Sequence, residues 1–357
     1  MDAVARYDPN KTYQWNYENA PAITPNSETQ PNVPTTEKNT PEVRLGIAAG
    51  PLLNGKWVLH YANLGFDDLT YKTVRSRPLA SYPLPNLVHV PDVAFQPGAQ
   101  LNNSPTVSDS WAISFGMPSM HPDQWRSDVE WTRKHLPAEK SLTVSVVATA
   151  EDNYTLDDIA QDYARCARWA VESGADAVEV NFSCPNVSSV DGQLYQQAQA
   201  AAVVASQVRH LAGQTPLWVK IGLVEDTEAI EQLVVCLNGI VDGIVTTNCI
   251  SARVASATGQ FFDGAPRGIG GSAILAGSIR QVARFHKCIA RTNSNLKIIG
   301  VGGISNAQHV LDYQAAGACA VQLATAAMLD PLVAMSIKHE LALRQNQPSP
   351  MRQTADG

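Results

Sequence analysis

The sequence has no long apolar run and no excess of basic residues. No stretch approaches the roughly 18 uninterrupted apolar residues of a membrane-spanning helix, and residues 1–21 lack the basic and apolar regions of a secretory signal. The formal net charge of -7 at pH 7 provides no positive field to attract nucleic acid or anionic lipid. We therefore expect a soluble cytoplasmic protein that binds neither nucleic acid nor membrane.

The cysteines are few and are not grouped. There are six, with no CxxC pair: Cys166, Cys184, Cys236, Cys249, Cys288 and Cys319. This spacing predicts neither disulfides nor a zinc or iron–sulfur site, and it favours a reducing compartment. No histidine stands out as the partner of a cysteine nucleophile. We expect no metal in this chain, and any Fe–S electron relay would come from another subunit.

The two ends of the chain are polar. Residues 1–42 are rich in Pro, Asn, Thr and Glu, too polar to bury a core of their own, and form an N-terminal arm that is extended or partly ordered. The arm is either a flexible tail or is pinned to the body, or to a second subunit, by the aromatics of TYQWNY at 12–17. Residues 346–357 form a C-terminal tail.

Residues 43–345 alternate short apolar runs with helical patterns. The apolar runs are 43–50, 68–74, 142–149, 176–183, 217–223, 243–248, 297–303 and 319–325. Helical periodicity covers 155–173, 194–212, 227–237, 272–290, 305–316 and 331–344. Eight strands with intervening helices predict an α/β protein with a (β/α)8 TIM barrel, in which functional residues gather where the strands end.

One segment is too long for a simple crossover. Residues 75–140 are rich in Pro, Ser and Asn and contain short strand-like pieces. A long segment of this kind inside a compact domain is usually functional. We expect an inserted lid or hairpin layer over the C-terminal face of the barrel.

Several predicted strands end in residues that suit binding better than packing. The first ends in Ala48, Ala49 and Gly50, which allow a flat ligand to approach the backbone; the others end in Lys72 and Thr73, in Lys220, and in Asn248 and Cys249. Either lysine alone can be explained as a side chain that extends to solvent. Two at equivalent strand ends indicate an anionic ligand.

Glycine-rich turns follow the last two strands. IIGVGGIS places Gly302 and Gly303 at one turn, and QLATAAM places Ala324 and Thr325 at the next. These are the loops at which barrels most often bind phosphate. RGIGGSAI at 267–274, with Gly268 and Gly270, can add further backbone donors. The pattern predicts a phosphorylated cofactor or substrate.

Cys184 follows a buried strand and precedes Pro185, which must end the strand. A buried thiol is most often inert packing. A thiol beside a cofactor at a strand end can instead act as a base or nucleophile. Both interpretations are open on this ground alone.

The motifs then resemble one family. NFSCPN at 181–186 is similar to the Asn-x-Ser-Cys-Pro-Asn motif of dihydroorotate dehydrogenases. Seven further motifs lie along the chain in that family's order: YKTV, ISFGMPS, VKIGL, TTNC, RGIGG, IIGVGGI and VQLATA. The resemblance implies an FMN-containing barrel that interconverts a CH–CH and a C=C bond in a small cyclic amide, with dihydroorotate as the default substrate. It implies Cys184 as the catalytic acid/base during hydride transfer to flavin N5.

The same resemblance implies the binding residues. Substrate contacts fall on Lys72, Asn181, Asn186, Asn248, Ser114, Gly116 and Met117. Cofactor contacts fall on Ala48, Ala49, Gly50, Lys72, Thr73, Ser145, Asn181, Lys220, Asn248, Cys249, Gly268, Gly270, Gly302, Gly303, Ala324 and Thr325. Lys220 matches a lysine near flavin N1/O2, where a cation stabilises the reduced anionic flavin.

A cysteine base and a polar N-terminus are similar to the soluble branch of the family, in which dimers are common and a soluble electron acceptor is expected. This chain departs from the usual pattern at Ile113, where the family usually has asparagine, and at Arg267 and Cys249. Losing a polar contact can shift selectivity strongly.

Three alternatives therefore stand beside the default. The first is a related flavoenzyme that desaturates or reduces another substrate. The second is a flavin-free isomerase or aldolase with Lys72 or Lys220 as a Schiff-base lysine. The third is a non-catalytic flavoprotein-like subunit.

Overall fold

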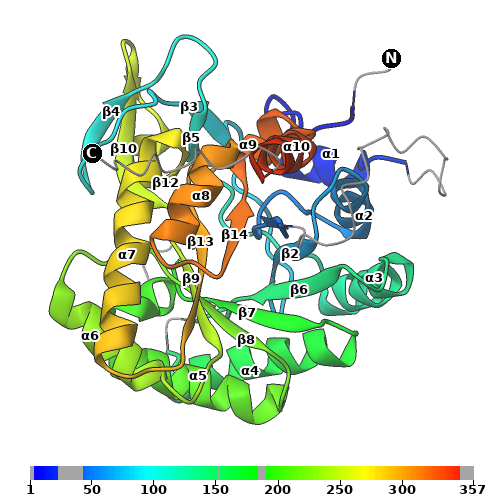
Figure 1. Ribbon diagram of the computed structural model, residues 1–357. Coiled ribbons are helices and arrows are strands. Elements are labelled where there is room, and N and C mark those ends of the chain that lie inside the picture. Colours follow the sequence, from blue (N-terminus) through cyan, green and yellow to red (C-terminus); the bar gives the residue numbers. More distant parts are fainter. Residues whose placement is uncertain (1–3, 23–42, 152, 184–189, 346–357) are drawn as a thin grey trace, which may run out of the picture.

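The protein was analysed as a computed structural model that describes residues 4–22, 43–151, 153–183 and 190–345. Eight parallel strands close into a barrel in the order β1-β14-β13-β9-β8-β7-β6-β2 (Figure 1). They are β1 (Gly46–Ile47), β2 (Asp68–Val74), β6 (Ser141–Val146), β7 (Ala177–Asn181), β8 (Leu217–Lys220), β9 (Gly243–Thr246), β13 (Lys297–Val301) and β14 (Ala320–Leu323). Each coincides with one of the predicted apolar runs, so the (β/α)8 prediction is confirmed.

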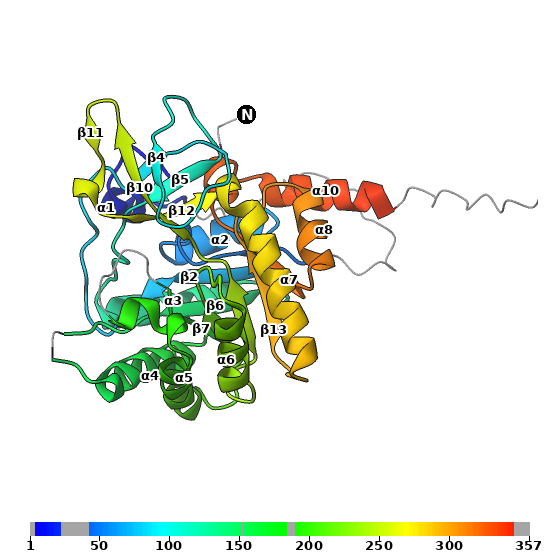
Figure 2. The same ribbon diagram turned by 90° about the vertical axis from the view of Figure 1, so that its left-hand side faces the viewer.

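Helices surround the barrel and pack on its outer face (Figures 1 and 2). They are α2 (Gly55–Asn63), α3 (Pro122–His135), α4 (Leu156–Glu172), α5 (Ala198–Ala212), α6 (Thr227–Leu237), α7 (Leu275–Arg291), α8 (Ala307–Ala315), the short α9 (Thr325–Leu329) and α10 (Val333–Gln345). Within the described parts of the chain, no helix is both long and apolar enough to cross a membrane.

Local sequence explains where these helices begin. At the start of α4, the Thr155 hydroxyl accepts a hydrogen bond from Asp158 N at 3.2 Å, and the Asp158 carboxylate accepts one from Thr155 N at 2.9 Å. This reciprocal pair is a capping box, which satisfies two backbone donors that the helix leaves without partners. The helical range predicted from the sequence, 155–173, therefore begins at the capping residue.

Alternation along each strand sorts its side chains between the two sides of the barrel wall. In β7, Val178 and Val180 belong to the apolar core between strands and helices. The intervening residues, Glu179 and Asn181, therefore face the barrel interior. One part of this interior is apolar, with Val245 and Ile299, whereas the part next to β7 is polar.

A second, smaller sheet lies over one end of the barrel (Figure 2). Its order is β11-β10-β12-β5-β3, with β4 paired to β10. The strands are β3 (Leu87–His89), β4 (Gln100–Asn102), β5 (Ser110–Ile113), β10 (Ile250–Ser256), β11 (Gly259–Gln260) and β12 (Arg267–Gly271). We call this the lid sheet.

The lid sheet differs in composition from the predicted insertion. Of the predicted range 75–140, the part with β3 to β5 joins the lid, but residues 122–135 form helix α3 of the barrel. The other half of the lid comes from the segment after β9, residues 250–271, where the sequence predicted only a turn that opens a helix. The two segments pair directly, as Gly268 with Ile113 and Gly270 with Trp111.

The N-terminal arm is docked on the barrel over residues 4–22. The arm contains helix α1 (Tyr13–Glu18). Trp57 of the barrel helix α2 donates a hydrogen bond from Nε1 to Asn16 O in α1, at 3.0 Å. Tyr7 and Tyr13 are buried against Phe115, with ring centroids 6.0 Å and 6.2 Å away. Of the two interpretations of the arm, the structure therefore shows the aromatic anchor in this segment.

Asn16 organises the docked arm, and its removal should loosen it. The buried Asn16 amide donates to Asp8 O and Thr12 O, both at 3.0 Å, and accepts from Asp8 N at 2.8 Å. We expect Asn16→Ala to leave these groups unpaired at a cost of about 1–3 kcal/mol. Trypsin should then cleave the arm at Arg6 and Lys11 about 5- to 150-fold faster than in the unchanged protein.

The matched control is Gln14→Ala, since Gln14 lies in the same helix but is exposed. This change should leave cleavage within about twofold of the unchanged protein. Equal cleavage rates for the two variants would contradict the role given to Asn16.

Candidate active site

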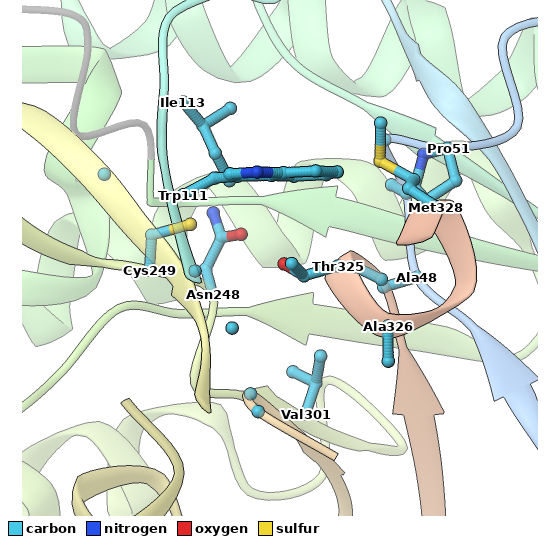
Figure 3. Close-up of a pocket in the computed structure, with 18 of the residues that line it drawn as sticks. Ala48, Pro51, Trp111, Ile113, Asn248, Cys249, Val301, Thr325, Ala326 and Met328 are labelled. Carbon is cyan, nitrogen blue, oxygen red and sulfur yellow. The ribbon is translucent and has the colours of Figure 1, made fainter. Parts of the chain in front are cut away.

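A cavity lies between the barrel and the lid sheet, at the carboxyl ends of the barrel strands. Its walls come from the barrel strand ends, from the lid sheet and from the N-terminal arm. Figure 3 shows Trp111 and Ile113 of the lid on one side and Val301 of β13 on the opposite side. The fold thus places three segments that are distant in sequence around one space.

Most of the site residues predicted from strand ends, from turns or from the family resemblance line this cavity. They are Ala48, Ala49, Gly50, Lys72, Thr73, Met117, Asn181, Lys220, Asn248, Cys249, Gly268, Gly270, Gly302, Gly303, Ala324 and Thr325. Because parallel strands all end at the same mouth of a barrel, residues at their ends converge although they are far apart in sequence.

Three predicted residues lie away from the cavity wall. Ser145 is fully buried in the barrel interior and accepts a hydrogen bond from the Thr73 hydroxyl at 3.0 Å. Ser114 accepts one from Arg267 Nε at 2.7 Å, and Gly116 packs against the Tyr82 ring. Cys184 and Asn186 lie outside the described residues.

The position of Ser114 follows from strand alternation. Trp111 and Ile113 line the cavity, whereas the intervening Ala112 belongs to the separate core of the lid sheet. Ser114 continues on the side of Ala112. A direct contact between its side chain and a ligand in the cavity is therefore not supported.

Two lysines give the floor of the cavity a positive charge. Lys72 is 7% exposed and Lys220 is 2% exposed, and both line the cavity. Burying an ammonium group is costly unless an anion or a polar ligand meets it. Lys220 Nζ lies 4.0 Å from Glu179 Oε1, at the outer limit of an ion pair.

Two asparagines organise the end of β7. Asn181 Oδ1 accepts from Ser183 N at 3.1 Å, and Asn248 Nδ2 donates to Ser183 O at 2.7 Å and to Ser183 Oγ at 2.9 Å. These bonds fix Ser183, the residue directly before Cys184. Amide side chains both donate and accept, which suits a ligand with alternating C=O and N–H groups.

The turn after β13 forms a cradle for backbone contacts with a ligand. Gly302 and Gly303 have φ values of +122° and +77°, which side chains rarely adopt. A Cβ at Gly303 would lie 2.8 Å from Gly271 O, and one at Gly302 would lie 2.5 Å from Ser278 Oγ. The turn is held by Tyr313, whose hydroxyl donates to Gly302 O at 2.7 Å.

The glycine cradle, the buried lysines and the amides fit a flavin mononucleotide. Backbone N–H groups at such turns bind phosphate, and a cation in the floor suits a ring that gains negative charge on reduction. Within the described parts of the chain, no group of three or more metal-ligating side chains is assembled.

The aromatic residues of the arm are part of the cavity, and the sequence did not assign them to it. Tyr7 and Tyr13 line the cavity, and the ring of each contacts that of Phe115, which follows β5 and also lines the cavity. Burial raises the pKa of both tyrosine hydroxyls, so they are neutral near pH 7. The signal was the motif TYQWNY, but docking depends on tertiary partners that the sequence does not reveal.

Arg75 was also missed. Its buried guanidinium donates from Nε to Met117 O at 3.0 Å, and Met117 has a φ of +50°. This bond holds the loop that carries Met117 against the cavity. An arginine two residues after Lys72–Thr73 gave no sign of this role, because its acceptor is a distant backbone carbonyl.

Comparisons with known proteins agree on one family. The family model described as dihydroorotate dehydrogenase matches residues 37–344. A dihydroorotate dehydrogenase of Dictyostelium discoideum is 34% identical, covering 92% of this chain and 95% of the relative. A dihydroorotate dehydrogenase (quinone) of Kineococcus radiotolerans is 30% identical over 85% of this chain and 79% of its own length.

A solved structure shares the fold. The crystal structure of DHODH in complex with ferulenol from Eimeria tenella matches with a TM-score of 0.67 at 22% identity, covering 84% of this chain and 81% of that chain. With the match of the family model over most of the sequence, the chain belongs to the dihydroorotate dehydrogenase family, whose members are oxidoreductases acting on CH–CH groups.

Proposed function

We propose that this protein oxidises dihydroorotate with bound FMN as the hydride acceptor and Cys184 as the base. The observation that carries the proposal is the meeting of Lys72, Lys220, Asn181 and Asn248 with the glycine cradle in one cavity of a chain from this family. Each of these groups suits one part of such a complex, and they come from different strands.

Bound FMN supplies a two-electron acceptor for the hydride that leaves the substrate. The chain's own residues supply the rest. The backbone of Gly302, Gly303 and Thr325 holds the phosphate, while Lys220 places a positive charge beside the ring. Asn181 and Asn248 orient the amide groups of the substrate, and Cys184 removes a proton from the neighbouring carbon.

The flavin-free alternatives are not favoured. Family membership supports redox chemistry, and a Schiff-base lysine needs a free amine, whereas Lys220 faces the Glu179 carboxylate. A flavoenzyme for another substrate is likewise not favoured, although Ile113 alters the roof of the cavity. The match to curated dihydroorotate dehydrogenases supports the default substrate.

The proposal also covers the location, the oligomeric state and the electron acceptor of the enzyme. A cytoplasmic location, a homodimer and a soluble electron acceptor are supported by the resemblance of the NFSCPN motif to the soluble branch. Light scattering at micromolar concentration tests the dimer, which requires twice the monomer mass of 38.4 kDa.

Replacing Cys184 should separate catalysis from cofactor binding. We expect Cys184→Ala to retain FMN and its yellow colour but to lose about 10²- to 10⁴-fold in kcat, the usual contribution of a positioned base. The control is Cys236→Ala, which alters a half-exposed cysteine of α6. Near-normal turnover in Cys184→Ala would rule out the thiol as the base.

Replacing Ile113 should show how the lid-sheet side of the cavity contributes to substrate binding. Ile113 lines the cavity, so an asparagine there adds one amide facing the ligand. One added hydrogen bond of about 0.5–1.5 kcal/mol should lower KM for dihydroorotate about 2- to 12-fold. Ile113→Val controls for lost packing. A higher KM in Ile113→Asn than in Ile113→Val would contradict dihydroorotate as the ligand.

Adding a methyl group to the glycine cradle should weaken FMN binding. Gly303→Ala brings a Cβ against Gly271 O and Leu275 at 2.8 Å and 2.7 Å, which forces the turn to move. We expect at least a tenfold rise in the Kd of the apoprotein for FMN, measured by flavin fluorescence. Gly239→Ala has a similar φ of +78° with open space around it, so it isolates the conformational cost. Equal Kd values for FMN in Gly303→Ala and Gly239→Ala would show that the phosphate does not bind at the Gly302–Gly303 turn.

A further inference from the structure

Glu179 is a carboxylate in the middle of a barrel strand, where strands usually carry apolar residues. It is 0% exposed, and its register partners are Ser145 on β6 and Trp218 on β8. Its neighbours in the chain, Val178 and Val180, pack outward against the helices. Glu179 therefore points into the barrel, below the floor of the cavity.

The carboxylate has little to stabilise it. Among the described residues, neither Glu179 oxygen has a hydrogen-bond partner. Its one ion-pair contact in those residues is Lys220 Nζ, 4.0 Å from Oε1. A buried carboxylate costs much free energy unless it is paired, so its presence at this position needs a reason.

The reason lies with Lys220. This lysine is 2% exposed, lines the cavity and stands in register with Asn181, one pair of positions above Glu179. Within the described residues, no other carboxylate oxygen comes within 4.0 Å of its ammonium group. The second lysine of the floor, Lys72, adds a like charge to the same cavity. Lys220 thus needs an anion beneath it to stay at this site.

We propose that Glu179 is a positioning residue that holds the Lys220 ammonium against the ring of the bound flavin. The inference rests on the proposed function, because it assigns Lys220 to the flavin. Glu179 is not among the residues that line the cavity. It acts by fixing the place from which Lys220 stabilises the negative charge of reduced flavin.

If Glu179 positions Lys220, its removal should shift the flavin midpoint potential in the direction opposite to that expected from the loss of a nearby negative charge alone. Removing a negative charge close to the ring should by itself favour reduced flavin. Removing the group that positions Lys220 should disfavour reduced flavin, because the stabilising cation is no longer held in place. The flavin midpoint potential therefore distinguishes the two effects.

The experiment compares the unchanged holoenzyme with Glu179→Gln, Lys220→Met and the double variant. Lys220→Met should reduce the preference for reduced over oxidised flavin at least tenfold, which is about 30 mV for a two-electron couple. Glu179→Gln should lower the potential in the same direction. Adding Glu179→Gln to Lys220→Met should cause no further fall.

A rise in potential in Glu179→Gln, equal in both backgrounds, would overturn the proposal. The control is Gln322→Met, which removes a different buried polar side chain of the interior, an amide that donates to Thr70 and whose Oε1 has no hydrogen-bond partner among the described residues. Its potential should match that of the unchanged protein. A fall as large as in Glu179→Gln would show that any loss of interior polarity is sufficient, and would also overturn it.

Folding provides a second test if Glu179→Gln is too unstable to purify. Removing one partner of a buried pair is more harmful than removing both. If the double variant folds where Glu179→Gln does not, the pairing of Glu179 with Lys220 is supported. An equal loss of folded protein in Glu179→Gln and in the double variant would contradict it.

If the unchanged protein binds no FMN, the proposed function fails. If it binds FMN but the variants show no coupling, only the role of Glu179 fails.

Discussion

Closure of the parallel barrel is the constraint on which the rest of the structure depends. Because all eight strands run in one direction, their carboxyl ends meet at one mouth. Lys72, Asn181, Lys220 and Asn248 stand on four different strands or their ends, yet they line one cavity. The lid sheet and the N-terminal arm cover that mouth, so the polar groups at the strand ends face a cavity that these two segments enclose.

The interior of the barrel is unusual for a folding core, and its composition follows from the site above it. Val245 and Ile299 fill one part with apolar side chains. The part below the lysines instead contains Thr70, Ser145, Glu179 and Gln322, all buried. Buried polar groups reduce stability unless they are satisfied. Among them, Glu179 lies under Lys220, which is consistent with stability given up to support a charged group that acts on a ligand.

The sequence predicted the barrel and much of the cavity because both depend on local patterns. Apolar runs mark buried strands, and a lysine or glycine at the end of such a run stands out. The resemblance implied a substrate contact at Ser114, but a motif does not show which side of a strand each residue faces, and the Ser114 side chain bonds to Arg267 instead of lining the cavity. The docking of Tyr7 and Tyr13 depends on Phe115, about 100 residues away, and β10 pairs with segments from the other half of the lid. Such contacts exist only in the folded chain.

If dihydroorotate is the substrate, it should reduce the flavin held in this cavity. Anaerobic titration of the purified, FMN-loaded protein with dihydroorotate tests it most directly, with flavin absorbance as the signal. We expect about one equivalent of dihydroorotate per bound flavin to remove the yellow colour, with orotate formed in equal amount. A protein that binds FMN but keeps its colour in excess dihydroorotate would contradict the proposed substrate. A protein that cannot be loaded with FMN would contradict the proposed function altogether.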